Sequence, residues 1–144
     1  MFERIIYVSR AAPGISARDT YEIIRVSHNR NRQFGLTGAL ILLDGYFLQV
    51  LEGDGRGVRQ RFAAISADTC HSGLEVRQRT FLRRLAFPDE WMAFRSGTEI
   101  APAIKEAFDY LPGFPTHRFE ADKLLAFALA CCQPHAESRA AATA

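Results

Sequence analysis

Short apolar runs along the chain predict its β-strands. Residues 3–9 form a run that is too short for a helix and rich in β-branched residues, which is typical of a central strand. Two further runs, at 36–43 and 46–51, flank Asp44-Gly45, a dipeptide that supplies the positive backbone angles of a type I′ turn. These two runs therefore predict a β-hairpin.

Helical periodicity appears before and after this hairpin. Ser16 to Asp19 resemble a capping box, and the helix that they open is expected to reach about Arg30. Its buried stripe is expected to contain Thr20, Ile23, Ile24, Ser27 and Asn31. A second helix follows the turn at 54–57, with an inner face of Val58, Phe62 and Ile65. The runs at 74–81 and 91–96 are two further strand candidates.

The resulting order, β-α-β-β-α-β-β, predicts an α+β fold with a ferredoxin-like sheet and one added strand. Right-handed crossovers place both helices on the same face of such a sheet. Segments 102–110 and 119–132 are expected to be helices that cover the other face. We therefore expect a sheet domain over 1–97, a helical cap over 98–133 and a disordered, alanine-rich tail over 134–144.

Composition and charge limit the possible functions. The 144 residues, 48% hydrophobic and 24% charged, suit one globular domain. A net charge of +2 is too small to indicate a nucleic-acid partner, and the local cluster of Arg77, Arg79, Arg83 and Arg84 is expected to be solvated. The N-terminus lacks the apolar core of a signal peptide, and no apolar run has the length of a membrane span, so we expect a cytoplasmic protein without membrane contact.

The spacing of the three cysteines does not indicate a disulfide framework or a metal site. Cys70, Cys131 and Cys132 are odd in number and include no C-x-x-C pair, so we expect free thiols and neither disulfides nor a zinc site. Cys70-His71 beside Asp68 could bind a metal in principle, but no second ligand cluster accompanies them.

Polar side chains occupy positions where the pattern predicts burial. Gln49 shares a strand face with Phe47 and Leu51, and an unpaired buried amide costs about 1–3 kcal/mol. In the expected topology the first strand lies beside the second strand of the hairpin, so Tyr7 can meet Gln49, and Asn31 points to the same region. Alternatively, Tyr7 caps a strand end, Gln49 bonds the backbone and Asn31 caps its helix. The joint placement favours a polar site between the two helices.

The same residues resemble those of the BLUF family, the blue-light sensors that use FAD. The resemblance covers residues 2–97 and includes several motifs at compatible spacing: Tyr7-x-Ser9, Asn31, Leu36-Thr37-Gly38-Ala39-Leu40, Gly45-x-Phe47-x-Gln49-x-Leu51-Glu52-Gly53, His71-x-x-Leu74 and Met92.

The resemblance implies a flavin held non-covalently between the two helices. FAD is the expected cofactor, with FMN or riboflavin as alternatives. Gln49 would bond the N5 and C4-carbonyl edge of the ring, and Asn31 its carbonyl and imide groups. Apolar walls would come from Ile23, Ile24, Leu51 and Ile65, with further contacts from Ser27, Arg30, Asp68 and His71.

The resemblance also implies how light acts. Excitation transfers an electron and a proton from Tyr7 through Gln49, whose amide then rotates or tautomerises. Tyr and Gln suit these roles because a phenol is oxidisable and an amide offers both a donor and an acceptor. The switch would comprise Tyr7, Gln49 and Met92.

Two departures from the family pattern concern this site. The family often has Trp two residues before the strand methionine, where this chain has Glu90, and its single Trp is Trp91. A strand over 91–96 would turn Met92 toward the flavin and Trp91 under the C-terminal helices, unless a bulge near Pro88 reverses the register. A position that is sometimes Arg in the family is Cys70 here.

Two rival functions use a similar fold. An acylphosphatase-like hydrolase needs a phosphate-cradling loop after the first strand, and 11–14 offers one Gly only; no catalytic constellation of His or carboxylates appears either. An RNA-binding sheet would need a stacking signature that is absent. We therefore expect a sensor and not an enzyme. Because no output domain follows residue 97, we expect output through a separate protein partner, which the sequence does not identify, or through a homo-oligomer.

Overall fold

A five-stranded sheet separates two layers of helices in the computed structural model, which describes residues 1–133. The strands are β1 (Phe2–Ala11), β2 (Thr37–Leu43), β3 (Tyr46–Gly53), β4 (His71–Leu82) and β5 (Ala93–Ser96). The helices are α1 (Ala17–Phe34), α2 (Gly55–Ser66), α3 (Pro102–Ala107) and α4 (Ala121–Cys132), with a short 3-10 turn at Gly97–Glu99. The predicted tail at 134–144 lies outside the described residues.

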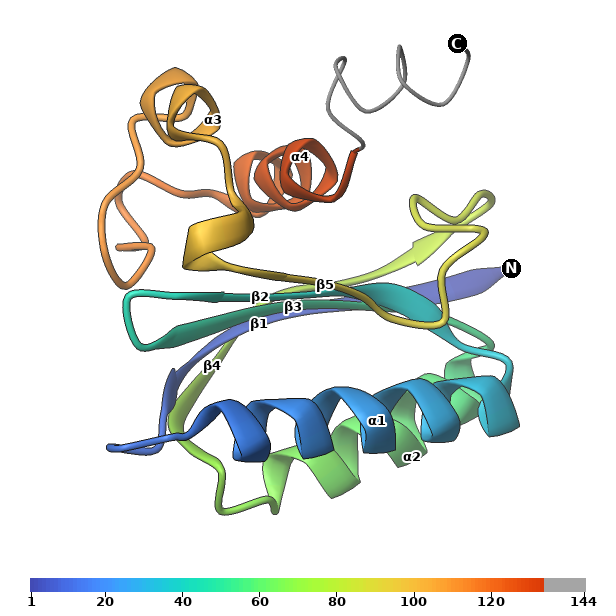
Figure 1. Cartoon of the computed structure of the whole chain (residues 1–144). Coiled ribbons are helices and arrows are strands. Elements are labelled where there is room, and N and C mark those ends of the chain that lie inside the picture. Colours follow the sequence, from blue (N-terminus) through green and yellow to red (C-terminus); the bar gives the residue numbers. More distant parts are fainter. Residues whose placement is uncertain (134–144) are drawn as a thin grey trace, which may run out of the picture.

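The strand order is β4-β1-β3-β2-β5, in which β1 and β3 lie at the centre. Neighbouring strands are antiparallel except β5, which runs parallel to β2. Helices α1 and α2 cover one face, and α3 and α4 lie over the other (Figure 1). This arrangement confirms the predicted α+β, ferredoxin-like fold with its added strand.

Local chemistry explains how the central hairpin and the first helix form. Asp44 and Gly45 have φ angles of 52° and 80°, and Leu43 pairs with Tyr46 across the turn, as the dipeptide predicts. Ser16 and Asp19 form the expected capping box of α1. The helix ends later than predicted, at Phe34 and not near Arg30, because Gly35 is the residue that adopts the left-handed conformation and ends it.

Gly38 allows β2 and β3 to pair closely. Its φ is 156°, and a Cβ atom at this position would lie 1.9 Å from the backbone oxygen of Val50. No other residue type has room there. Gly38 also donates its backbone N–H to the oxygen of Glu90 at 3.1 Å, which attaches the segment before β5 to the sheet.

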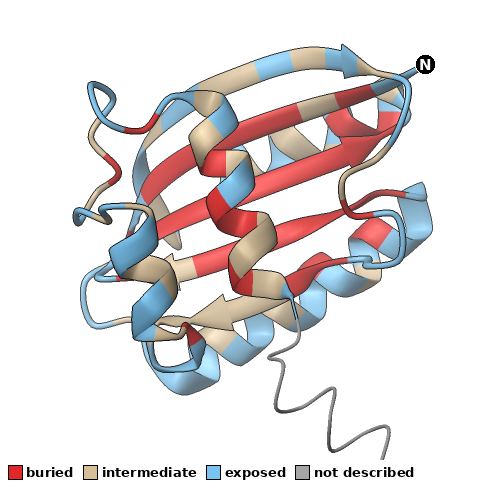
Figure 2. Ribbon diagram, turned by 90° about the horizontal axis from the view of Figure 1, so that it is seen from above, coloured by how far each residue is buried: buried red, intermediate tan, exposed pale blue. Residues whose placement is uncertain are grey.

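The sheet face under α3 and α4 carries the larger apolar core. Figure 2 shows the buried central strands crossed by α4. Phe114, Phe119 and Phe127 are fully buried there, together with apolar residues of β2 and β3. Arg77 donates hydrogen bonds to the carbonyls of Phe114 and Phe119, so this member of the arginine cluster holds the 114–119 segment against β4 and is not simply solvated.

Two strands differ from their predicted bounds. β4 begins at His71 and not at Leu74, because its pairing with β1 extends to Ala11 opposite His71. β5 begins at Ala93 and not at Trp91, because the oxygens of Glu90 and Trp91 are taken by Gly38 and by the side chain of Asn31. Among residues 1–133, no helix combines the length and the apolarity needed to cross a bilayer.

Candidate functional site

Three side chains form a buried row on the sheet face covered by α1 and α2. Tyr7 and Gln49 are paired residues of β1 and β3, and the Tyr7 hydroxyl donates a hydrogen bond to Gln49 Oε1. Gln49 Nε2 lies 3.8 Å from Met92 Sδ, a weak acceptor. The three residues are 3%, 2% and 4% exposed. The predicted meeting of Tyr7 with Gln49 is thus confirmed.

A cavity of about 220 Å³ opens beside this row, between the two helices and the sheet. Its apolar lining comes from both helices and the hairpin: Ile23, Val26, Leu40, Phe47 and Ile65. Its polar lining comes from Tyr7, Gln49, Glu22, Ser27, Arg61, Asp68, Cys70 and His71. Apolar walls with a few convergent polar groups are typical of a site for a small organic ligand.

The lining includes most of the residues predicted to contact a cofactor. Ile23, Ser27, Gln49, Ile65, Asp68 and His71 all line the cavity, and so does Tyr7 of the predicted switch. Ile24 is half-buried on α1 and Arg30 is exposed, and neither is part of the lining. Leu51 is buried in a cluster with Ile5, Tyr7 and Val58, and neither Leu51 nor Asn31 is part of the lining.

Asn31 is the last buried residue of α1, near the C-terminal end of the helix, and it is fully buried. Its Nδ2 donates to the backbone oxygen of Trp91 at 2.6 Å, while its Oδ1 has no hydrogen-bond partner in the described part of the chain. The side chain therefore does not cap α1. A buried amide oxygen without a donor is costly, and an N–H group of a ligand would satisfy it.

Met92 and Trp91 occupy different environments, although neither is part of a strand. Met92 packs with Leu40 and Phe47 beside Gln49, as its expected register requires. The predicted burial of Trp91 under the C-terminal helices is wrong, because the side chain is 39% exposed. The two residues precede β5, so strand alternation does not direct their side chains to opposite faces.

His71 is fixed by hydrogen bonds at both ring nitrogens. Nε2 lies 2.8 Å from the backbone oxygen of Ile65, and Nδ1 lies 2.7 Å from Ser9 Oγ. Because a carbonyl oxygen only accepts, Nε2 carries a hydrogen, and in the neutral ring Nδ1 accepts from Ser9. With both nitrogens occupied, His71 presents ring carbons to the cavity.

The electrostatics of the site keep its acidic groups in defined protonation states. Burial raises the pKa of Tyr7 far above its usual range, so its phenol remains neutral and retains its proton. Burial likewise raises the pKa of the Cys70 thiol to about 12, so the thiolate is not formed at neutral pH. The backbone N–H of Cys70 lowers the pKa of the Asp68 carboxyl, which is therefore charged.

Sequence reasoning missed several lining residues, and some left a readable signal. Leu40 is the cross-strand partner of Gln49, and Phe47 shares the face of Gln49, so the hairpin register already pointed to both. Arg61 precedes Ile65 by one helical turn and so shares its face of α2. The charge of Arg61 argued against an inward position, so its place in the cavity lining is evident only from the structure.

The geometry fits a flat heteroaromatic ligand with polar edges. Leucine, isoleucine and phenylalanine side chains supply the walls, and Gln49 and Ser27 supply hydrogen-bonding groups. Asn31 Oδ1 adds a buried acceptor without a partner among residues 1–133. An isoalloxazine ring has this combination of apolar faces and a carbonyl and imide edge.

Comparisons with known proteins agree with a flavin site in this cavity. A family model described as BLUF, sensors of blue-light using FAD, matches residues 2–93. The photoactivated adenylate cyclase subunit beta of Euglena gracilis is 32% identical over 95 residues, which cover 66% of this chain and 11% of that protein. This chain therefore spans about a ninth of that relative.

Solved structures extend the likeness to most of the chain. BlrB, a BLUF protein in its dark state, is 26% identical with a TM-score of 0.73, over 90% of this chain and 96% of that one. The photo-activated state of BlsA has a TM-score of 0.81 at 20% identity, over 94% of this chain and 97% of that one, and supports the fold alone. With its sheet, its paired Tyr7 and Gln49 and the family match over 2–93, the chain belongs to the BLUF family of flavin-binding blue-light sensors.

Proposed function

We propose that Tyr7, Gln49 and Met92 are the light-sensitive switch of this sensor and that its flavin occupies the cavity between α1 and α2. The observation that carries the proposal is the Tyr7–Gln49 hydrogen bond at the wall of that cavity. A bound flavin supplies absorption of blue light and an excited state that accepts an electron.

The side chains of Tyr7, Gln49 and Met92 can adopt two hydrogen-bond arrangements. In the present arrangement Tyr7 donates to Gln49 Oε1, and within residues 1–133 the acceptor for Gln49 Nε2 is the Met92 thioether alone. Turning the Gln49 amide by half a rotation would exchange its oxygen and nitrogen, so Nε2 would donate to the Tyr7 oxygen. The exchange gives up a weak contact at Met92, because a thioether is a weak acceptor, and it replaces the hydrogen bond that Tyr7 donates with one that Tyr7 accepts. Met92 can adapt to either arrangement because its side chain is flexible.

The contact set of the flavin is also a proposal. Ile23 and Ile65 line the cavity from opposite helices and would pack on the ring, and Ser27, Asp68 and His71 also line the cavity. Asn31 would use its unpartnered Oδ1 for an N–H of the ring. Ile24, Arg30, Asn31 and Leu51 lie outside the lining, so their contact requires a cofactor that extends beyond it. FAD is the proposed cofactor, with FMN and riboflavin as smaller alternatives.

The proposed output is signalling without catalysis by this chain. Residues 1–97 would sense light and residues 98–133 would cap the sheet, with the signal passing to a separate protein or through a homo-oligomer. The Euglena relative is named an adenylate cyclase, but this chain matches 11% of it. The family match gives no support to an acylphosphatase-like hydrolase. Free thiols at Cys70, Cys131 and Cys132 suit the proposed cytoplasmic location.

Absorption spectra of two matched variants test the switch. The wild-type chain should show oxidised flavin and a small, reversible red shift after blue light. Tyr7→Phe should bind flavin equally well and lose the shift, because the packing remains while the transferable proton is removed. Tyr46→Phe removes a hydroxyl on the opposite face of the sheet and should shift normally. A normal shift in Tyr7→Phe, or a chain that binds no flavin, contradicts the proposal.

A further inference from the structure

Arg61 is a cation of the cavity wall for which the described chain offers no acceptor. It lies on α2 and lines the cavity together with Tyr7, Ile65 and Asp68. Its Nε atom is buried and has no hydrogen-bond partner, and none of the ion pairs found within residues 1–133 includes it. Burying a charge without a partner is expensive, so this placement needs an explanation.

Comparison with the other half-buried arginines makes Arg61 stand out. Arg4 is paired with the carboxylate of Glu52 at 2.7 Å. Arg77 and Arg95 each donate to two backbone carbonyl oxygens. In residues 1–133 the fold thus provides oxygen acceptors for every other half-buried guanidinium, and it leaves the one at the cavity without any.

The nearby charges do not replace a partner. Burial is the main influence that lowers the pKa of the Arg61 guanidinium, and repulsion from Arg30 adds to it. Asp68 attracts the guanidinium, but its Oδ1 accepts the backbone N–H of Cys70 at 2.8 Å. Cys70 on the same rim carries a neutral thiol, a weak hydrogen-bonding group. Within residues 1–133, therefore, no acceptor lies within hydrogen-bonding distance of the buried Nε, and a molecule in the cavity can supply one.

We propose that Arg61 donates hydrogen bonds to an oxygen of the bound flavin and thereby anchors the cofactor. This inference rests on the proposed function, because it takes the cavity to be the flavin site. A guanidinium is suited to a carbonyl oxygen and to a phosphate oxygen alike, since it offers several N–H donors in one plane. Arg61 would then be a binding residue that does not belong to the Tyr7–Gln49 switch.

The test compares Arg61→Gln with Arg56→Gln in the full 144-residue chain. Arg56 is on the same helix but exposed, so it controls for the loss of one charge and for the substitution itself. Flavin dissociation is followed by the fluorescence that appears when the flavin-loaded protein is diluted. Arg61→Gln should weaken binding about tenfold or more, as expected for loss of a hydrogen bond to a charged group, whereas Arg56→Gln should bind like wild type.

Three flavins distinguish the source of the oxygen. Equal weakening for riboflavin, FMN and FAD would assign Arg61 to the ring or the ribityl chain, which all three share. Weakening for FMN and FAD but not for riboflavin would assign it to the phosphate. Unchanged affinity for all three flavins, relative to Arg56→Gln, would overturn the inference. A wild-type chain that binds no flavin would instead overturn the proposed function.

Stability without flavin separates a binding role from a structural one. Because Arg61 has no partner in the described chain, Arg61→Gln should leave the urea midpoint of the flavin-free protein unchanged or raised. Added flavin should then raise the midpoint of this variant less than that of wild type. Arg61→Lys, which keeps the charge but loses the planar donor set, should bind flavin with intermediate affinity. A flavin-free Arg61→Gln protein that unfolds more easily than wild type would point to a structural role and contradict the inference.

Discussion

Two buried polar clusters on β3, three residues apart, are built in opposite ways. Gln49 faces α1 and α2, and its amide nitrogen has a thioether 3.8 Å away as its protein acceptor. Glu52 lies on the other side of the strand and is fully buried. Its Oε2 accepts from Arg4 Nε at 2.7 Å, and its Oε1 accepts the backbone N–H groups of Ala86 and Phe87 at 2.8 and 3.0 Å.

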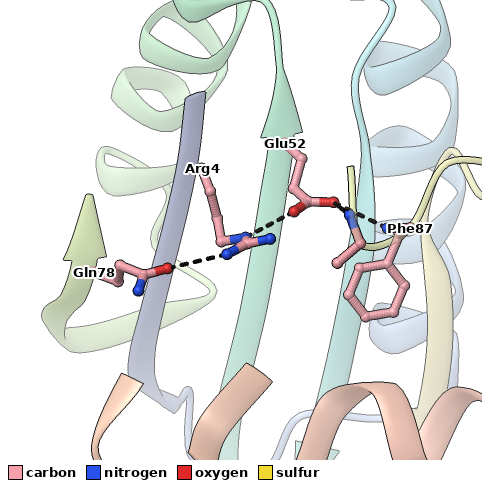
Figure 3. A network of polar contacts seen from close by, with 5 residues as sticks. Arg4, Glu52, Gln78 and Phe87 are labelled. Carbon is pink, nitrogen blue, oxygen red and sulfur yellow. Dashed lines mark hydrogen bonds and ion pairs between the residues drawn. The ribbon is translucent and has the colours of Figure 1, made fainter. Parts of the chain in front are cut away.

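Figure 3 shows how the Glu52 cluster joins distant segments. Arg4 of β1 links the carboxylate to Gln78 of β4, and Glu52 holds the segment that leads toward β5. Charge-assisted hydrogen bonds are short and strong, so this cluster has one favoured arrangement. The Gln49 amide nitrogen has a weaker partner, the Met92 thioether, and the amide can exchange its oxygen and nitrogen. A fixed cluster and an adjustable one therefore share a single strand.

The largest expected effect comes from breaking the fixed cluster. Glu52→Ala should lower the free energy of unfolding by about 3–5 kcal/mol, because it leaves Arg4 without its partner and the N–H groups of Ala86 and Phe87 without an acceptor. Glu52→Gln should cost less, since its amide oxygen still accepts hydrogen bonds. Urea unfolding of both variants measures the difference. A Glu52→Ala protein as stable as wild type would show that the cluster is not fixed.

Changing the adjustable cluster should affect function more than stability. Gln49→Leu should lower the free energy of unfolding by about 1–2 kcal/mol, mostly because the buried Tyr7 hydroxyl loses its acceptor. The variant should still bind flavin and should show no red shift, because leucine has no amide to re-pair. Urea unfolding and light-minus-dark spectra measure the two effects. A light-induced shift like that of wild type would exclude Gln49 from the switch.

Met92→Leu sharpens the comparison by removing only the sulfur acceptor. Its similar volume should keep the stability change below about 1.5 kcal/mol. The return of the light state to the dark state should change in rate several-fold, because Gln49 Nε2 loses the thioether in one of its two arrangements. Recovery of the absorption spectrum in darkness gives this rate. An unchanged rate would mean that Met92 packs beside Gln49 without influencing it.

Trp91→Phe should have the smallest effect. The side chain is partly exposed, and Asn31 bonds the backbone oxygen of this residue, which the substitution retains. The stability change should stay within about 0.5 kcal/mol, as for most surface substitutions. Dark recovery should be that of wild type. If recovery changes more in Trp91→Phe than in Met92→Leu, the indole is the residue that acts on the switch.

Periodicity and turn chemistry predicted the features that depend on local sequence. The Asp44-Gly45 turn fixes the hairpin register, and that register with the split β-α-β order brings Tyr7 opposite Gln49. Contacts between distant segments were not predictable in this way. The backbone partners of Glu52, at Ala86 and Phe87, lie more than thirty residues later, in a connection without helix or strand, and their spacing leaves no pattern.

The predicted position of Trp91 was wrong for the same reason, because contacts between distant segments decide it. A strand over 91–96 follows from its apolar pattern, but hydrogen bonds from Gly38 and Asn31 hold the preceding backbone away from the ladder. Arg61 illustrates the opposite case, because its position on the inner face of α2 follows the helical period while its charge contradicts it. Only the neighbouring cavity, which requires the folded chain, explains this conflict.

The position of Trp91 has a consequence for observing this protein. It is the single tryptophan of the 144-residue chain, and its backbone oxygen accepts a hydrogen bond from Asn31, next to the residue that contacts Gln49. Indole emission depends on the polarity around the ring, and this ring is partly in contact with solvent. The chain therefore carries a natural fluorophore on the segment between the cavity and β5, and its emission can follow movement of that segment without any added label.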